Sequence, residues 1–116
     1  MAKELNLPQF LDLLKKGAEL VDVRESEELS EGRIEKTKHW PLSSFGLRQT
    51  DISKTRPTIF YCRTGLRSLK AAEIASSWTT QEVFSLRGGY LAYVNDKEKS
   101  RDNPPETGQF FSCKGV

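Results

Sequence analysis

The sequence feature that most constrains the fold is an apolar strand that leads through a short loop directly into a helix. Thr58-Ile59-Phe60-Tyr61 is a β-branched and aromatic run, which is typical of a strand. The stretch Leu69-Lys70-Ala71-Ala72-Glu73-Ile74-Ala75 predicts a helix. Only the segment Cys62-Arg63-Thr64-Gly65-Leu66-Arg67-Ser68 separates the two. A cysteine therefore follows a strand end and precedes the first turn of a helix.

Strand and helix patterns alternate along the rest of the chain, and Pro8 and Gly17 suit the two ends of a first helix. Ala71, Ile74, Ala75 and Trp78 form an apolar stripe that we expect to face a sheet. Alternating elements predict an α/β fold, with a parallel sheet flanked by helices on both faces and ligands outside the carboxyl ends of its strands. We expect strands at 19–23, 58–61 and 82–86, helices at 8–16, 26–30, 69–75 and 91–94, and one helical turn at 45–48.

The loop after the strand at 58–61 has the composition of a nucleophile site. Helix N-terminal amides and the helix dipole favour an anion, so a Cys62 thiolate is stabilised there and can act as a nucleophile. Gly65 lets the chain curl so that successive amides point into one concave nest. Arg63 and Arg67 add two positive charges. The alternative is that Cys62 is only a buried core thiol, and the flanking arginines and glycine favour the catalytic role.

This loop resembles the active-site loop of rhodanese-type sulfurtransferases, and three further motifs occur in that family's order over roughly residues 18–94. They are Leu20-Val21-Asp22-Val23-Arg24-Glu25 with Glu31-Gly32-Arg33-Ile34, then Trp40-Pro41-Leu42 near a short strand, and Ser85-Leu86-Arg87-Gly88-Gly89-Tyr90 at a double-glycine turn. Two departures stand out: Arg33 replaces a common histidine, and Glu35-Lys36-Thr37 replaces the usual proline-glycine-alanine.

The resemblance implies a parallel five-stranded sheet and a thiosulfate sulfurtransferase that works through a Cys62 persulfide. Its substrates would be a small anionic sulfur donor and a thiol or cyanide acceptor, with a thiol protein as a further partner. The donor would be bound by Arg63, Thr64, Gly65, Leu66 and Arg67. Two other readings stay open: a non-catalytic binding module on the same scaffold, and a carrier that accepts a persulfide from a protein donor.

Loop length separates sulfur transfer from phosphate chemistry. The spacing from Cys62 to Arg67 is Cys-x4-Arg, whereas cysteine phosphatases and arsenate reductases use Cys-x5-Arg. One peptide unit more widens the nest for a tetrahedral oxyanion, and one fewer fits a single sulfur atom on the cysteine. No aspartate general acid can be placed either, and a phosphatase would need one.

Several side chains near these motifs have predicted structural roles. Arg67 could bind the donor or pair with a carboxylate such as Asp22 or Glu73. We expect Asp22 and Arg24 to form a buried pair. We expect Thr64 and Ser68 to form hydrogen bonds within the loop, Ser68 either as a helix cap or to the sulfur itself. His39 is expected to be neither an acid nor a base, and Trp40 and Trp78 are expected to lie in the core.

The 116-residue length suits one domain, which we place at residues 1–95, followed by an extended or partly docked tail at 96–116. The net charge of +2 is too small to indicate nucleic acid, and no apolar run suits a membrane span. Cys62 and Cys113, with the lone His39, have no metal-ligand spacing, so no metal or cofactor is predicted. Cytoplasm is the expected location. In the tail, Cys113 is expected to be a bystander or a resolving thiol, and Phe110 and Phe111 a docking pair.

Overall fold

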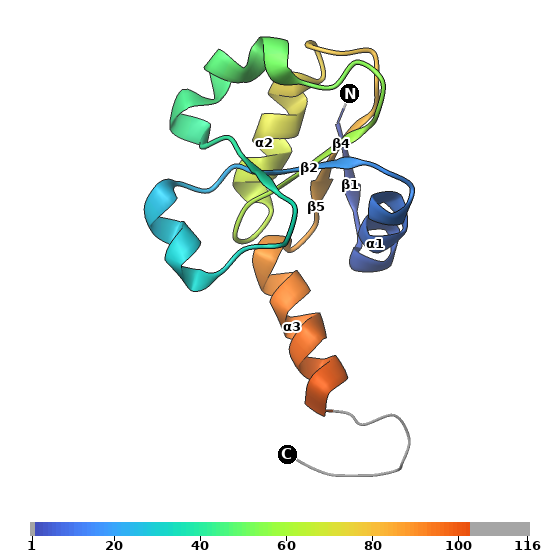
Figure 1. Cartoon of the computed structure of the whole chain (residues 1–116), viewed down its shortest axis with the longest axis vertical. Coiled ribbons are helices and arrows are strands. Elements are labelled where there is room, and N and C mark those ends of the chain that lie inside the picture. The colour runs from blue at the N-terminus through green and yellow to red at the C-terminus, as the bar shows by residue number, and fades with distance from the viewer. Residues whose placement is uncertain (1, 103–116) are drawn as a thin grey trace.

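The fold is built on one sheet of five parallel strands, and the computed structural model describes residues 2–102 (Figure 1). The strand order across the sheet is β1-β5-β4-β2-β3, which confirms the predicted five-stranded parallel sheet. The strands are β1 (Lys3–Leu5), β2 (Glu19–Asp22), β3 (Lys38–His39), β4 (Thr58–Tyr61) and β5 (Val83–Leu86). The helices are α1 (Leu7–Lys15), α2 (Leu66–Ala75) and α3 (Gly89–Asp102), with 3-10 helices η1 (Ser26–Glu31) and η2 (Leu42–Asp51).

Both faces of the sheet are covered, as the strand and helix alternation predicted. One face carries α2 and η2, and its core includes Phe45, Phe60 and Ala71. The other face carries α1 and the start of α3, and its core includes Phe10 and Ile59. Because the central strands β4 and β5 are buried on both sides, all their residues are buried, and apolar and polar positions do not alternate along them.

The N-terminal strand β1 was not located by the sequence pattern. It is only three residues long and contains Lys3 and Glu4, which are exposed at the edge of the sheet. Asn6 follows it and forms a capping box with Gln9, each side chain accepting from the other's backbone N–H at 2.9 Å. This cap begins α1 one residue before the predicted helix at 8–16, which the structure otherwise confirms.

Helix α2 differs from the prediction in two respects. It begins at Leu66, inside the loop, rather than at Leu69, because Gly65 in a left-handed conformation supplies its N-cap. Ile74 was expected to face the sheet, but it is 41% exposed. The buried positions of the helix are Ser68, Ala71, Ala72 and Ala75, so the contact with the sheet is made by small side chains that let the helix approach closely.

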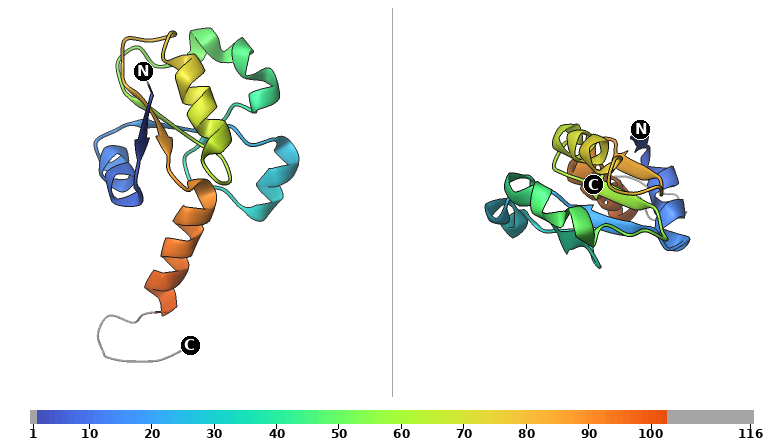
Figure 2. Two further views of the ribbon diagram at one scale, coloured as in Figure 1. Left: turned by 180° about the vertical axis from the view of Figure 1, so that it is seen from behind. Right: turned by 90° about the horizontal axis from the view of Figure 1, so that it is seen from above.

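The tail expected from residue 96 onward is a helix as far as Asp102, because α3 continues through it. Both figures show α3 projecting away from the body, so most of this helix needs no apolar stripe (Figures 1 and 2). Its first turn is docked on the body, and the good helix formers Lys97 and Glu98 extend a helix that is already nucleated. Phe110, Phe111 and Cys113 lie outside the described residues.

Within residues 2–102, no helix is both long enough and apolar enough to cross a membrane.

Candidate active site

Cys62 lies directly after the carboxyl end of β4, below the surface, with its sulfur facing backbone amides. The Gly65 N–H lies 3.0 Å from Cys62 Sγ, and the Ser68 N–H lies 3.4 Å from it. Cys62 itself is fully buried. Two amides directed at one sulfur favour a negative charge on that sulfur. The sequence predicted that amides of the loop and of the helix N-terminus face the sulfur, and in the structure these are the amides of Gly65 and Ser68.

Gly65 is the residue that allows the loop to close around the sulfur. Its φ is +103°, a conformation that other residues adopt only with strain. A Cβ at this position would also lie 3.1 Å from both the Gly88 nitrogen and the Leu86 carbonyl oxygen. Gly65 therefore lets the loop curl and also lets it pack against the turn between β5 and α3.

The first turn of α3 holds the outer side of the same loop. The Tyr90 N–H donates to the Cys62 carbonyl at 2.8 Å, and the Leu91 N–H donates to the Arg63 carbonyl at 3.1 Å. A Cβ on Gly89 would lie 2.6 Å from the Arg63 carbonyl oxygen, closer than real side chains approach. The double-glycine turn seen in the sequence thus allows the helix to reach the loop carbonyls. These two hydrogen bonds hold the Cys62 and Arg63 carbonyls on the outer side of the loop, while the Gly65 and Ser68 amides on its inner side face the sulfur.

A buried pair of hydroxyls supports the loop from below. Ser68 Oγ and Ser85 Oγ are 2.8 Å apart, and they lie 3.2 and 3.3 Å from the Gly65 carbonyl oxygen. Ser68 was expected to act as a cap or to contact the sulfur itself; its hydroxyl binds the Gly65 carbonyl and its backbone amide binds the sulfur. Ser85 was quoted only as part of a motif. Its role could not be predicted from the sequence, because the sequence does not show on which face of the sheet the Ser85 side chain lies.

Arg67 is held by Glu28, a residue of η1. Arg67 Nη1 and Nη2 each lie 2.7 Å from one of the two Glu28 carboxylate oxygens, so the pair is bidentate. The hydrogen bonds from Arg67 lower the pKa of Glu28 to about 2, and they raise the pKa of Arg67. Asp22 and Glu73 were the partners suggested from the sequence, and both suggestions were wrong. Glu28 is 39 residues away along the chain, and only the placement of η1 beside the loop brings the two together.

The other loop side chains are more exposed. Arg63 Nη1 lies 3.6 Å from a Glu31 carboxylate oxygen, and the Arg63 side chain is 49% exposed. Leu66 is 79% exposed and Thr64 is also exposed. The Thr64 side chain makes no hydrogen bond to any residue that the structure describes, so its predicted bond within the loop is absent there. These residues surround Cys62 through their backbone rather than through their side chains.

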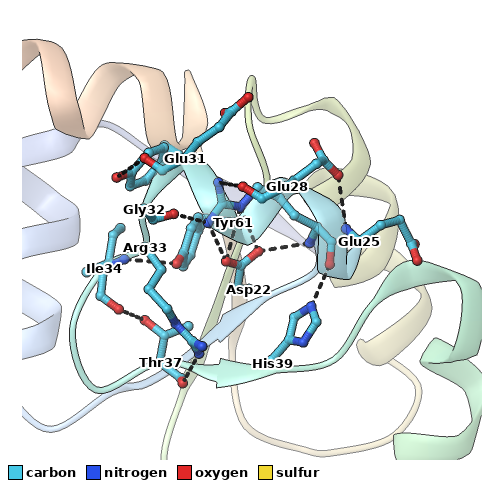
Figure 3. Close-up of polar contacts among 12 residues, drawn as sticks. Asp22, Glu25, Glu28, Glu31, Gly32, Arg33, Ile34, Thr37, His39 and Tyr61 are labelled. Carbon is cyan, nitrogen blue, oxygen red and sulfur yellow. Dashed lines mark hydrogen bonds and ion pairs between the residues drawn. The ribbon is translucent and has the colours of Figure 1, made fainter.

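Asp22 and Arg24 form the buried ion pair that the sequence suggested, and Figure 3 shows the contacts around Asp22. Arg24 Nη2 lies 2.8 Å from Asp22 Oδ2, and neither side chain is exposed. The Arg24 guanidinium also donates to the carbonyls of Gly32, at 2.7 Å, and Glu28, at 3.4 Å, and it lies over the Tyr90 ring. Arg24 therefore holds η1 at two points, Glu28 in its middle and Gly32 directly after its last residue.

The turn after η1, where the sequence departs from the resembled motif, is held by Tyr61. The Ile34 N–H donates to the Tyr61 hydroxyl at 3.1 Å, and burial raises the pKa of Tyr61 to about 12 (Figure 3). Arg33 Nη2 donates to the Thr37 carbonyl at 2.8 Å. His39 Nε2 lies 2.7 Å from the Arg24 carbonyl oxygen, so its contact is structural, as expected. Trp40 is buried and Trp78 packs on the same core, which confirms both predictions.

Comparison with known proteins gives consistent results. The family model "Rhodanese-like domain" matches residues 6–96. A protein of Allochromatium vinosum named sulfurtransferase is 34% identical over 75 residues, covering 65% of this chain and 70% of that protein. The crystal structure of a rhodanese-like domain protein from Staphylococcus aureus aligns with a TM-score of 0.70 at 21% identity, covering 95% of this chain and 99% of the other.

Some relatives are longer than the segment they share with this chain. An uncharacterised protein of Bacillus subtilis is 34% identical over 73 residues, which is 63% of this chain and 58% of that protein.

Proposed function

Because this chain belongs to the rhodanese-like domain family, whose relatives include named sulfurtransferases, we propose that it transfers a sulfane sulfur from thiosulfate or a similar donor to a thiophilic acceptor through a Cys62 persulfide. The observation that carries this proposal is the pair of backbone amides on Cys62 Sγ, at 3.0 Å from Gly65 and 3.4 Å from Ser68. They stabilise the Cys62 thiolate, which attacks the donor in the first step and is restored in the second.

In the first step the Cys62 thiolate attacks the outer sulfur of thiosulfate. A new S–S bond forms to Cys62, and the S–S bond within thiosulfate breaks, so that sulfite leaves with the bonding electron pair. The cysteine becomes a persulfide anion with the same charge as the original thiolate. The amides of Gly65 and Ser68 then face the inner sulfur, and the rest of the loop surrounds the outer one.

In the second step an acceptor removes the outer sulfur. Cyanide attacks that sulfur, the persulfide S–S bond breaks toward Cys62, and thiocyanate leaves while the thiolate is restored. A thiolate acceptor reacts in the same way and becomes a persulfide, so a thiol protein can also receive the sulfur. The only nucleophile that the chemistry takes from this chain is Cys62, and the reaction needs no metal or cofactor. It requires a reduced Cys62, which supports the cytoplasm as its place of action.

The loop residues divide into those that act through the backbone and those that act through charge. We propose that Arg63, Thr64, Gly65, Leu66 and Arg67 form the donor site. The peptide units from Arg63 to Leu66 shape it, because the Thr64 and Leu66 side chains are exposed. Arg63 supplies accessible positive charge for the donor, whereas Arg67 lies at the edge of the site with its charge paired to Glu28.

The shape of the loop disfavours a phosphatase. The Gly65 and Ser68 amides both point at one sulfur atom, and Arg67 already holds a carboxylate through both terminal nitrogens. An incoming phosphate would have to compete with Glu28 for that guanidinium.

A steady-state assay of sulfur transfer from thiosulfate to cyanide tests the proposal. We expect Cys62→Ala and Cys62→Ser to abolish thiocyanate formation, because each removes the nucleophile. Cys113→Ser is the matched control, since it removes the other cysteine of the chain, and it should retain most of the activity. Activity that survives in Cys62→Ala would show that the proposed nucleophile is wrong.

A further inference from the structure

The two arginines of the loop have different surroundings. Arg67 makes two hydrogen bonds of 2.7 Å to the Glu28 carboxylate and is partly buried. Arg63 makes one long contact, at 3.6 Å, to the half-exposed Glu31. A bidentate arginine and carboxylate pair is strong and fixed in geometry, whereas an exposed single contact contributes little. In this loop, therefore, the Arg67 guanidinium is immobilised and the Arg63 guanidinium remains accessible to a small anion.

Glu28 is itself fixed before it meets Arg67. Its carboxylate accepts the Glu25 N–H at 2.9 Å, and its carbonyl accepts from Arg24 at 3.4 Å. Arg24 is in turn held by the buried Asp22 carboxylate through three contacts of 2.8 to 3.1 Å. A continuous series of polar contacts therefore runs from the sheet, through η1, to the guanidinium of Arg67, and Figure 3 shows its part around Asp22, Glu25 and Glu28.

The position of Arg67 in the chain gives this series an effect on the sulfur. Arg67 lies in the first turn of α2, immediately before Ser68, whose amide donates to Cys62 Sγ. Fixing the Arg67 side chain to η1 fixes this turn relative to β4, which carries Cys62 at its end. The Ser68 contact of 3.4 Å is the longer of the two amide contacts, so a small movement of the turn would weaken it first.

We propose that Arg67 and Glu28 act together as a positioning pair for the amide nest around Cys62, and that Arg63 is the cation that binds the anionic donor. This inference deepens the proposed sulfur transfer and rests on it for its kinetic test. It gives the Asp22 and Arg24 pair a role as well, because that pair holds η1 where Glu28 can reach the loop.

Steady-state kinetics with thiosulfate separate the two roles. Glu28→Gln and Arg67→Gln should each lower kcat about tenfold with little change in KM, because a charge-assisted bidentate contact is lost and the nest is misaligned. Arg63→Gln should instead raise KM about two- to fivefold, with kcat nearly unchanged, as expected for an exposed charge. Salt should raise the wild-type KM and have less effect on the KM of Arg63→Gln. Arg48→Gln, which removes an arginine from an exposed pair with Asp51, is the matched control and should behave as wild type.

Two further variants decide the role of Arg67. Arg67→Lys keeps the charge but loses the bidentate fork, so it should be nearly as impaired as Arg67→Gln. The double variant Glu28→Arg with Arg67→Glu restores an opposite-charge pair and should have a higher kcat than either Glu28→Arg or Arg67→Glu alone. If Arg67 binds the donor directly, Arg67→Lys will retain activity and the double variant will be no better than the single ones. Either result would overturn the inference.

A second measurement is independent of thiosulfate. The rate at which uncharged iodoacetamide alkylates Cys62 depends on the nest and not on donor binding. Glu28→Gln and Arg67→Gln should change this rate by about threefold or more, and Arg63→Gln should leave it unchanged. Equal rates in all three variants would overturn the positioning role even in folded protein. If wild-type Cys62 gains no sulfur from any donor, the proposed function fails, and the alkylation rates still test the pair.

Discussion

The close approach of α3 to the loop around Cys62 gives the most specific prediction, which concerns Gly89→Ala. The added methyl group would lie 2.6 Å from the Arg63 carbonyl oxygen, at a residue whose φ is +60°. Since the clash is with backbone, the helix must move, and the hydrogen bonds from Tyr90 and Leu91 to the loop lengthen. Each bond is worth about 0.5–1.5 kcal/mol. Left-handed backbone adds about 1–2 kcal/mol of strain. We expect Gly89→Ala to lose about 2–5 kcal/mol of unfolding free energy in total.

Gly17→Ala is the matched control for this experiment. Gly17 also has a positive φ, +99°, but a Cβ there would have no atom within 4 Å. It should cost only the strain, about 1–2 kcal/mol. Urea unfolding followed by the fluorescence of Trp40 and Trp78, which both pack in the core, gives both values, and the same samples give the rate of sulfur transfer. Gly89→Ala should lower that rate even where it is fully folded, while Gly17→Ala should not. Equal losses of stability and equal transfer rates in the two variants would refute the proposed contact between α3 and the loop.

Four other changes test different parts of the site. Ser85→Ala removes half of the buried hydroxyl pair, so unfolding free energy should fall by about 0.5–1.5 kcal/mol, and sulfur transfer should slow; unchanged stability in urea would argue against that support. Tyr61→Phe leaves the Ile34 N–H without its 3.1 Å partner, which should cost about 1–3 kcal/mol by the same measurement. Because the folded pKa of Glu28 is depressed, its contribution to stability is present above pH 4.5 and is lost as the pH falls toward about 2; urea midpoints across this range should fall less steeply in Glu28→Gln than in wild type. One glycine inserted after Gly65 lengthens the loop to Cys-x5-Arg and should slow sulfur transfer more than about tenfold, and an undiminished rate would defeat the argument from loop length.

The sequence predicted the parts of this site that depend on neighbours in the chain. Cys62 was placed after a strand and before a helix because the apolar run at 58–61 and the helical pattern at 69–75 are local signals. The same holds for Gly65 and for the pairing of Asp22 with Arg24, which are two residues apart. The two-sided packing of the sheet followed from the alternation of strands and helices.

The sequence could not predict contacts that depend on how distant elements meet. Glu28 is one of four glutamates between residues 25 and 31, and only the fold shows which of them reaches Arg67. Ser85 supports the loop from a neighbouring strand, across 17 residues of sequence from Ser68. The strand β1 was missed because its charged residues lie at a sheet edge, and the helical part of the tail was missed because α3 leaves the body and carries no apolar stripe there.

The mass of the protein after incubation with thiosulfate, followed by peptide mapping without reductant, tests the central claim most directly. The account predicts that the wild type gains the mass of one sulfur, located on the peptide that contains Cys62, and that cyanide removes it. Cys62→Ala should gain none, and Cys113→Ser should behave as the wild type. A wild type that gains no sulfur from thiosulfate or from a low-molecular-weight persulfide, or that carries it on a peptide without Cys62, would contradict the account.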